Sequence, residues 1–137
     1  MILLVIDGQG GGIGKNIIEQ IKALNGDITI IAAGTNSLAT SAMIKAGADH
    51  AATGENAILY NCLHCDMIVG PIGIILSNAM FGEVSSKIAD AVSSSPAPKW
   101  LVPISKCNVS IAGIQNKPLN QYIDDIVRQI LAYLEQA

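Results

Sequence analysis

Residues 5–15 read VIDGQGGGIGK, and glycine occupies positions 8, 10, 11, 12 and 14 of the chain. The apolar run Ile2–Ile6 leads into this stretch and is typical of a buried parallel strand. Apolar residues then recur at helical spacing from Ile13 to Leu24. A glycine loop between a strand and a helix lets backbone N–H groups approach an anion at the positive end of the helix. The stretch therefore predicts an α/β fold whose first loop binds a phosphate or a dinucleotide.

The rest of the chain alternates short apolar runs with longer amphipathic ones. Strands are predicted at Ile2–Ile6, Ile28–Ala33, Asp49–Ala52, Met67–Val69, Trp100–Ile104 and Val109–Ile114. Helices are predicted at Ile13–Leu24, from the turn 34–37 to Ala46, from the turn 53–56 to Cys65, at Ile74–Ser94 with a break near Gly82, and at Leu119–Glu135. Such alternation forms right-handed βαβ units. We predict one Rossmann-like domain over residues 1–137, a doubly wound and mostly parallel sheet of about six strands with helices on both faces.

The composition indicates a surface that is poor in charge. A chain of 137 residues has the size of one ordinary domain. Only 14% of its residues are charged, so a monomer would expose apolar area, and we expect a homo-oligomer. Ile72–Phe81 is the expected contact surface, and the C-terminal helix is the alternative. The net charge is −3 and the basic residues are scattered singly, which predicts no nucleic-acid partner.

The sequence also bears on cellular location. Residues 1–7 contain no basic region of the kind that opens a signal peptide. The longest apolar run, Ile68–Leu76, is interrupted by Gly70, Pro71 and Gly73 and is too short to span a bilayer. Three cysteines, an odd number, argue against a disulfide framework. We therefore expect a cytoplasmic protein with free thiols and no membrane partner.

Four polar or glycine-rich turns follow predicted strands, where doubly wound sheets bind their ligands. These turns are residues 8–14, 34–37, 53–56 and 70–73. Each alone is ordinary turn chemistry, but together they predict a site for a small phosphate-bearing ligand. The candidate binding residues are Asp7, Gly8, Gly10, Gly11, Gly12, Ile13, Gly14, Lys15, Thr35, Asn36, Thr53, Gly54, Glu55, Gly70, Pro71 and Gly73. The sequence identifies no catalytic residue.

Two carboxylates near this edge each have two interpretations. Asp7 ends the first strand, where its oxygens either accept hydrogen bonds from loop amides, the interpretation we favour, or contact a ribose or a metal. Glu55 is most simply a first-turn acid stabilised by the helix dipole. Its alternative role is that of a general base above the crevice.

Cys62-Leu63-His64-Cys65 is a CxxC motif at the end of a predicted helix. A zinc site needs about four ligands, and only Cys107, His50 and His64 remain to complete one. A redox CxxC belongs instead at a helix N-terminus. We interpret these cysteines as packing thiols and expect no bound metal.

The spacing Gly8-x-x-x-Gly12-Ile13-Gly14 resembles the cofactor loop of short-chain dehydrogenases. The resemblance implies NAD(P) or another nucleotide as cofactor. The Tyr-x-x-x-Lys pair of that family is missing, since Tyr60 and Tyr122 are not followed by lysine at that spacing. The second strand also ends without the Asp or Glu that binds an NAD ribose and without an Arg for an NADP phosphate. Thr35 and Asn36 are the ribose donors that remain there.

The same loop resembles the phosphate loop of ParA/MinD-type ATPases. It has one glycine more than that motif, Gln9 in place of a lysine, and Asn16 in place of the magnesium-binding Thr or Ser. The comparison implies phosphate binding, and we do not expect ATP hydrolysis.

Longer motifs resemble a bacterial family that contains a domain of unknown function. The motifs are IDGQGGGIG, GTN, AGAD, TGENA and GPIGI, and the resemblance covers nearly the whole chain. It implies no activity, so three functions stay open. The protein binds a nucleotide or dinucleotide, or it is an enzyme that acts on a small phosphorylated metabolite, or it is a non-catalytic oligomeric sensor or scaffold.

Overall fold

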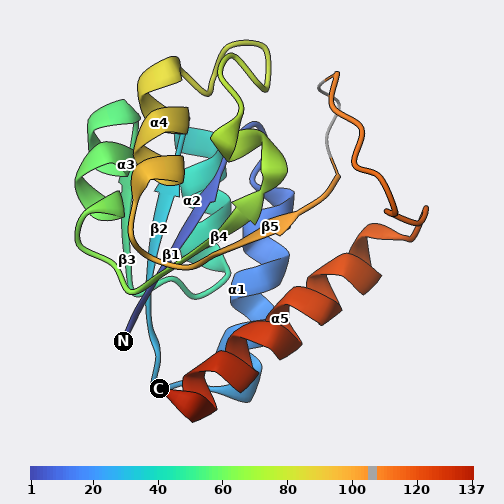
Figure 1. Cartoon of the computed structure of the whole chain (residues 1–137). Coiled ribbons are helices and arrows are strands. Elements are labelled where there is room, and N and C mark those ends of the chain that lie inside the picture. The colour runs from blue at the N-terminus through green and yellow to red at the C-terminus, as the bar shows by residue number, and fades with distance from the viewer. Residues whose placement is uncertain (105–107) are drawn as a thin grey trace.

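Five parallel strands form one sheet in the order β3-β2-β1-β4-β5 in the computed structural model, which describes residues 1–104 and 108–137 (Figure 1). The strands are β1 (Ile2–Asp7), β2 (Thr29–Gly34), β3 (His50–Thr53), β4 (Met67–Pro71) and β5 (Lys99–Val102). Five of the six apolar runs that were predicted as strands form strands, and the exception is the last one, Val109–Ile114. The fold is α/β and close to the predicted Rossmann-like form.

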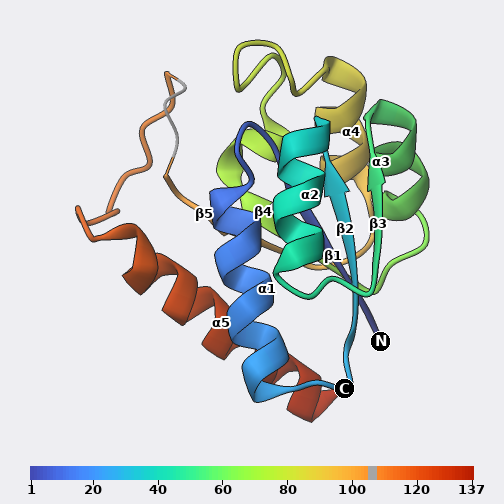
Figure 2. The same cartoon turned by 180° about the vertical axis from the view of Figure 1, so that it is seen from behind.

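Helices cover both faces of the sheet (Figures 1 and 2). The helices are α1 (Gly12–Leu24), α2 (Ser37–Lys45), α3 (Glu55–Cys62), the 3-10 helix η1 (Ile72–Ile75), α4 (Ser86–Ser94) and α5 (Leu119–Gln136). One apolar cluster joins the sheet to α1, α2 and α5, and a second joins it to α3, α4 and η1. No helix in the described ranges is both long enough and apolar enough to cross a membrane.

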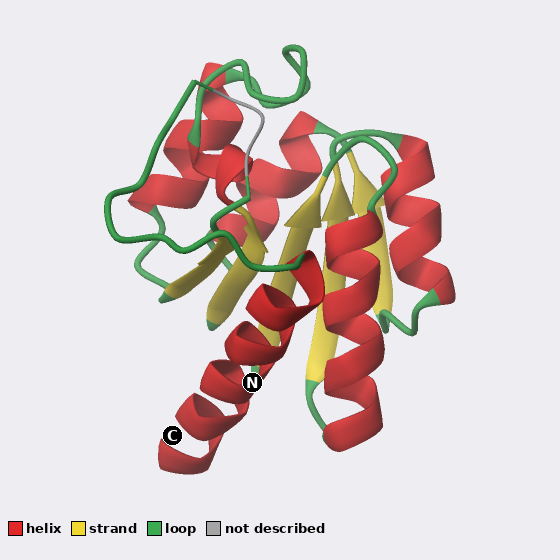
Figure 3. Cartoon of the chain, turned by 90° about the vertical axis from the view of Figure 1, so that its right-hand side faces the viewer, coloured by secondary structure: helices red, strands yellow, loops and turns green. Residues whose placement is uncertain are grey.

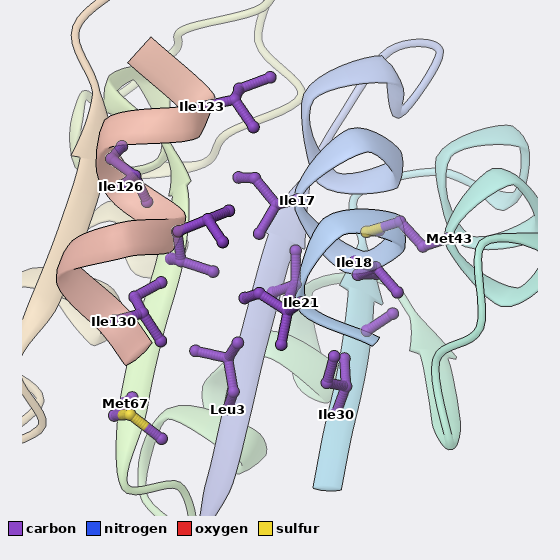
Figure 4. Packing of buried hydrophobic residues seen from close by; sticks show 14 of the residues in the cluster. Leu3, Ile17, Ile18, Ile21, Ile30, Met43, Met67, Ile123, Ile126 and Ile130 are labelled. Atoms are coloured by element: carbon purple, nitrogen blue, oxygen red, sulfur yellow. The ribbon is translucent and has the colours of Figure 1, made fainter. Parts of the chain in front are cut away.

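The first cluster fills the layer between the sheet and α1 and α5 (Figure 4). Ile17 and Ile21 of α1 lie between Leu3 of β1 and the apolar side of α5, which contributes Ile126 and Ile130. Burial of each such side chain stabilises the fold by roughly 1.5–3 kcal/mol. The helical spacing read from the sequence therefore corresponds to the buried side of α1.

The strand order reverses between β1 and β4. From β1 the chain proceeds outward to β2 and β3, then returns across the sheet to β4 on the other side of β1. β1 pairs with β2 from Ile2 to Asp7 and with β4 from Leu3 to Val5. All carboxyl ends therefore lie at one edge, where Figure 3 shows several loops gathered above the arrowheads. A reversal of this kind opens a crevice for ligands.

Two sequence predictions are wrong in detail. The predicted strand Val109–Ile114 is absent from the sheet, and the described residues form five strands rather than about six. Residues 109–114 are exposed and pair with no described strand, so their alternating apolar side chains cover no part of the core. The predicted helix Ile74–Ser94 is divided into η1 and α4.

The segment that separates η1 from α4 is a compact loop beyond the carboxyl edge (Figure 1). Asn78, Met80 and Phe81 have positive φ, which is uncommon for residues other than glycine. The amide of Asn78 donates to the carbonyl of Val84, and the amide of Val84 donates to the carbonyl of Ala79. These hydrogen bonds close residues 77–84, hereafter the edge loop, on themselves.

Candidate functional site

A cavity of about 900 Å3 lies at the carboxyl edge where the strand order reverses. Its wall includes residues 7–13 from the end of β1 through the glycine loop, Pro71 at the end of β4, Gly73 in η1, and residues 75–81. Ile104, Asn108, Val109 and Leu119 border its opposite side. The volume is within the range of about 300–1,000 Å3 that is usual for small-molecule sites.

Asp7 holds the base of the glycine loop. It is 3% exposed, and its carboxylate accepts hydrogen bonds of 2.7 Å from the amides of Gly8 and Gly14. Burial raises the pKa of Asp7 above its ordinary value, although the hydrogen bonds from Gly14, Gly8 and Ile13 act in the opposite direction. The structural role favoured from the sequence is therefore observed, with Asp7 taking the place of a helix cap that Gly11 cannot supply.

Three glycines of the loop are required by packing. A Cβ atom on Gly8 would lie 2.5 Å from the Met80 sulfur, and one on Gly14 would lie 2.6 Å from the Met43 sulfur. Gly11 has a φ of 73°, and its Cβ would lie 2.8 Å from the backbone of Ala39. These positions are explained by the tight turn itself, without any ligand.

Gly10 and Gly12 are different. A Cβ atom on either would meet no atom of the described residues within 4 Å, and neither glycine has the positive φ that excludes other residues. Both line the cavity, and neither amide has a hydrogen-bond partner in the described part of the chain. The turn does not require glycine at these two positions, and their N–H groups remain available to an anion at the start of α1.

Glu83 is a carboxylate that sequence reasoning missed. One of its oxygens, Oε1, accepts three hydrogen bonds, from the amide of Gln9 at 2.9 Å, from Thr35 Oγ1 at 2.6 Å and from Asn36 Nδ2 at 2.8 Å. Burial alone would raise the pKa of Glu83, but these bonds outweigh it and hold the pKa below its ordinary value. The edge loop is thus attached to the glycine loop and to the end of β2.

The four predicted turns all lie at the carboxyl edge, but only two border the cavity. Residues 8–13 and residues 71 and 73 line it, whereas Gly14, Lys15 and Gly70 do not. Thr35 and Asn36, the proposed ribose donors, are bound to Glu83 instead.

The third turn lies farther along the edge. Thr53 donates to Thr40, Gly54 precedes α3, and Glu55 accepts a hydrogen bond of 2.5 Å from Ser85. Glu55 lies in the first turn of α3, as the simpler interpretation predicted. None of these three residues is in contact with the cavity.

The two cysteines of the CxxC motif lie far from this edge, at the end of α3. Burial raises the pKa of the Cys62 thiol to about 12, and burial also raises the pKa of Cys65. Within residues 1–104 and 108–137 no three His, Cys, Asp or Glu side chains gather to hold a metal ion. Cys107, a ligand candidate from the sequence, lies outside the described residues, as does Lys106.

The parallel sheet, the reversed strand order and the cavity beside the glycine loop define a Rossmann-like α/β protein with its cavity at the switch point. Residues 2–135 match the family described as domain of unknown function (DUF3842), and the chain belongs to that family. No curated protein matches the chain.

Among solved structures, the chain is similar to the dodecameric FMN-dependent UbiX-like decarboxylase from Escherichia coli O157:H7. The TM-score is 0.54, the identity is 14%, and the match covers 98% of this chain and 94% of that chain. A likeness at this identity shows a shared fold.

Proposed function

We propose that this protein binds a nucleotide, with its phosphate on Gly10 and Gly12 and its ring system in the cavity. The observation that carries the proposal is the coincidence of three features at the strand reversal. The cavity, the amides of these two glycines, which have no partner among the described residues, and the N-terminus of α1 all meet there. Each feature also occurs without a ligand in other proteins, but their combination is typical of nucleotide sites.

The glycine loop provides the phosphate end of the proposed site. Without a Cβ at Gly10 or Gly12, a phosphate oxygen can reach the backbone N–H groups directly. The helix dipole of α1 adds a partial positive charge at this end. Lys15 lies one turn into α1 and is exposed, so its charge contributes at longer range.

The rest of the cavity suits a planar, weakly polar group. Ile75, Leu76, Met80 and Val109 provide apolar contacts along its wall. A nucleobase or a flavin ring has this character. The fold neighbour is an FMN-dependent enzyme, which makes FMN the first ligand to test.

The cavity favours nucleotide binding over acid–base chemistry by the protein itself. Asp7 is the only Asp, Glu, His, Lys or Cys among the described residues that line it. Its two oxygens already accept amide hydrogen bonds from Gly8 and Gly14. An enzyme that acts on a phosphorylated metabolite needs a free acid or base within reach of the substrate. In this protein any chemistry is therefore assigned to the bound nucleotide.

The proposal is tested by calorimetric titration with FMN, NAD(H), NADP(H), ATP and GTP. Gly12→Val fills the proposed phosphate position with a branched side chain and is expected to abolish binding. Gly26→Ala is the matched control, because Gly26 is equally open and lies in the turn at the far end of α1. Lys15→Ala is expected to weaken binding only severalfold, since the backbone donors remain.

Two results would overturn the proposal. One is a wild-type protein that binds none of these nucleotides and no phosphorylated compound in a wider thermal-shift screen. The other is a Gly12→Val variant that binds as tightly as Gly26→Ala. Either result would leave the loop as a structural turn and would favour the scaffold function.

A further inference from the structure

We infer that the site accepts a mononucleotide and excludes a dinucleotide, because Glu83 and Met80 fill the half of the crevice above β2. The inference rests on the proposed function and specifies its ligand class. The deciding contact is made by Glu83 Oε1 of the edge loop. This oxygen accepts hydrogen bonds from the glycine loop and from the residues that follow β2, and so joins the three segments.

A dinucleotide needs space on both sides of the glycine loop. In doubly wound folds its phosphates lie on the helix N-terminus, one nucleoside extends over the end of β2, and the other extends past the switch point. A residue at the end of β2 then binds the ribose hydroxyls. In this protein that place corresponds to Thr35 and Asn36, which directly follow β2.

The polar groups at the end of β2 are already engaged. Thr35 Oγ1 and Asn36 Nδ2 both donate to Glu83 Oε1, and Asn36 Nδ2 also lies 3.0 Å from the carbonyl of Gln9. Asn36 Oδ1 accepts from the amide of Ala39 and caps α2. A ribose at this position would have to displace a carboxylate that accepts three hydrogen bonds, which are stronger than neutral ones because the acceptor is charged.

Met80 closes the same half of the crevice sterically. A Cβ atom added to Gly8 would lie 2.5 Å from the Met80 sulfur and 2.6 Å from Thr35 Oγ1. Gly8 thus has side chains packed directly against it, whereas Gly10 and Gly12 meet open space among the described residues. The open space continues on the other side, toward Pro71, Ile104 and Leu119.

The negative charge of Glu83 also disfavours a dinucleotide. Glu83 binds the amide of Gln9, the residue directly before Gly10, so its carboxylate lies beside the proposed phosphate position. A second phosphate group that extended toward β2 would face this negative charge at short range. A single terminal phosphate on Gly10 and Gly12 can keep to the cavity side of the loop.

The test compares each dinucleotide with the mononucleotide that forms half of it, FMN with FAD and AMP with NAD. We expect the wild-type protein to bind the mononucleotide at least tenfold more tightly in the pair that it recognises. Glu83→Ala combined with Met80→Ala is expected to bring the two affinities of that pair to within about twofold. Glu135→Ala, which removes one negative charge from the exposed end of α5, is the control and should leave the ratio unchanged.

The melting temperature of the double variant shows that it folds, and its own mononucleotide affinity is the reference for its ratio. Glu83→Gln, which keeps an acceptor oxygen but removes the negative charge, is expected to bring the two affinities part of the way together, and it serves if the double variant does not fold. A wild-type protein that binds FAD or NAD as tightly as FMN or AMP overturns the inference and leaves the proposed function standing. Loss of dinucleotide binding in Glu83→Ala overturns it too, since Glu83 would then be the ribose acceptor. Binding of no nucleotide removes the proposed function, and the inference with it.

Discussion

The carboxylate of Asp7 accepts a hydrogen bond of 2.7 Å from the amide of Gly14, and so joins the end of β1 to the first turn of α1. The second oxygen accepts from the amide of Gly8 at the same distance. Two N–H groups of the loop thus have their partner in Asp7, whereas those of Gly10 and Gly12 have no partner among the described residues. Asp7 thus holds both ends of the loop, and Glu83 holds the amide of Gln9 between them.

Removal of the Asp7 carboxylate is expected to destabilise the fold. Asp7→Ala leaves the amides of Gly8 and Gly14 buried without a partner, at a cost of about 2 kcal/mol. Asp7→Asn keeps one acceptor oxygen and should lose less. Urea unfolding at pH 7 measures both, with Asp27→Ala in an exposed turn as the control. Equal stability of Asp7→Ala and the control would contradict the role given to this residue.

The raised pKa of Asp7 determines the direction in which its contribution to stability changes with pH. Burial raises its pKa in the folded protein above the value of 3.8 for the unfolded chain. The folded state therefore retains this proton to higher pH than the unfolded state. The contribution of Asp7 is most favourable below pH 4 and is lost as the pH rises through the raised pKa.

Unfolding free energies of the wild-type protein and Asp7→Asn across pH 3 to 7 isolate this effect. The stability of the wild-type protein relative to the variant should fall as the pH rises from about 4. The contribution of Glu83 to stability changes with pH in the opposite direction, because its pKa is lowered on folding and its stabilising effect is lost on acidification. The contribution of Glu83 cancels in the difference between the two proteins, because both contain this residue. A difference that stays constant with pH would show that the pKa of Asp7 is not raised.

The regular elements could be predicted from the sequence, because each is specified by its own residues. The apolar run before Gly8 and the helical spacing after it correspond to β1 and α1 within a residue. Residues 109–114 have a strand-like pattern, yet a strand also needs a neighbour with which to pair and a core to cover, and these exposed residues join neither edge of the described sheet. Local pattern does not contain that information.

The site was predictable only in part for a related reason. The glycine loop is contiguous in sequence, so its position after β1 was visible. Glu83 reaches Gln9 across 74 residues through a loop with left-handed Asn78, Met80 and Phe81. Met and Phe seldom adopt positive φ, so the sequence predicted helix there. A contact made by such a loop has no signal in a single sequence.

Substitution of Gly11 should affect stability more than substitution of Gly12. Gly11→Ala forces a side chain into a left-handed backbone with φ of 73° and against the backbone of Ala39, at a cost of about 2 kcal/mol or more. Gly12→Ala places a Cβ in open space at the first position of α1 and should leave the melting temperature unchanged or slightly raised. Thermal unfolding followed by circular dichroism compares the two. The reverse order would show that the loop adopts a different conformation.

The Cys62 thiol is expected to be unreactive in the folded protein. It is 1% exposed and burial raises its pKa to about 12, so the thiolate fraction at pH 8 is very small. Iodoacetamide at pH 8 should modify Cys62 at least a hundredfold faster in urea than in the native protein. Peptide mass spectrometry assigns the modified residue, which separates Cys62 from Cys65 and Cys107. Equal rates in the two conditions would contradict the buried position.

Self-association is expected from apolar side chains that the chain leaves uncovered. In the apolar stretch 72–81, the contact surface expected from the sequence, Gly73, Ile74 and Ala79 are buried, but Phe81 at the rim of the cavity is 99% exposed. Ile111, in the exposed segment beyond β5, is 40% exposed. Association that covers such residues removes apolar surface from water. Sedimentation velocity at micromolar concentration should therefore give a mass above that of the 14.3 kDa chain.

The double variant Phe81→Ser, Ile111→Ser should sediment as a smaller species at the same concentration. Leu63→Ser is the matched control, since Leu63 is 74% exposed but lies after α3, away from the carboxyl edge. Loss of association in the control as well would place the contact elsewhere, with α5 as the next surface to test. At about 50 micromolar, even a weak homodimer is expected to form. A wild-type protein that sediments as a monomer at this concentration would contradict the prediction, because the exposed side chains would then have no partner in a second copy of the chain.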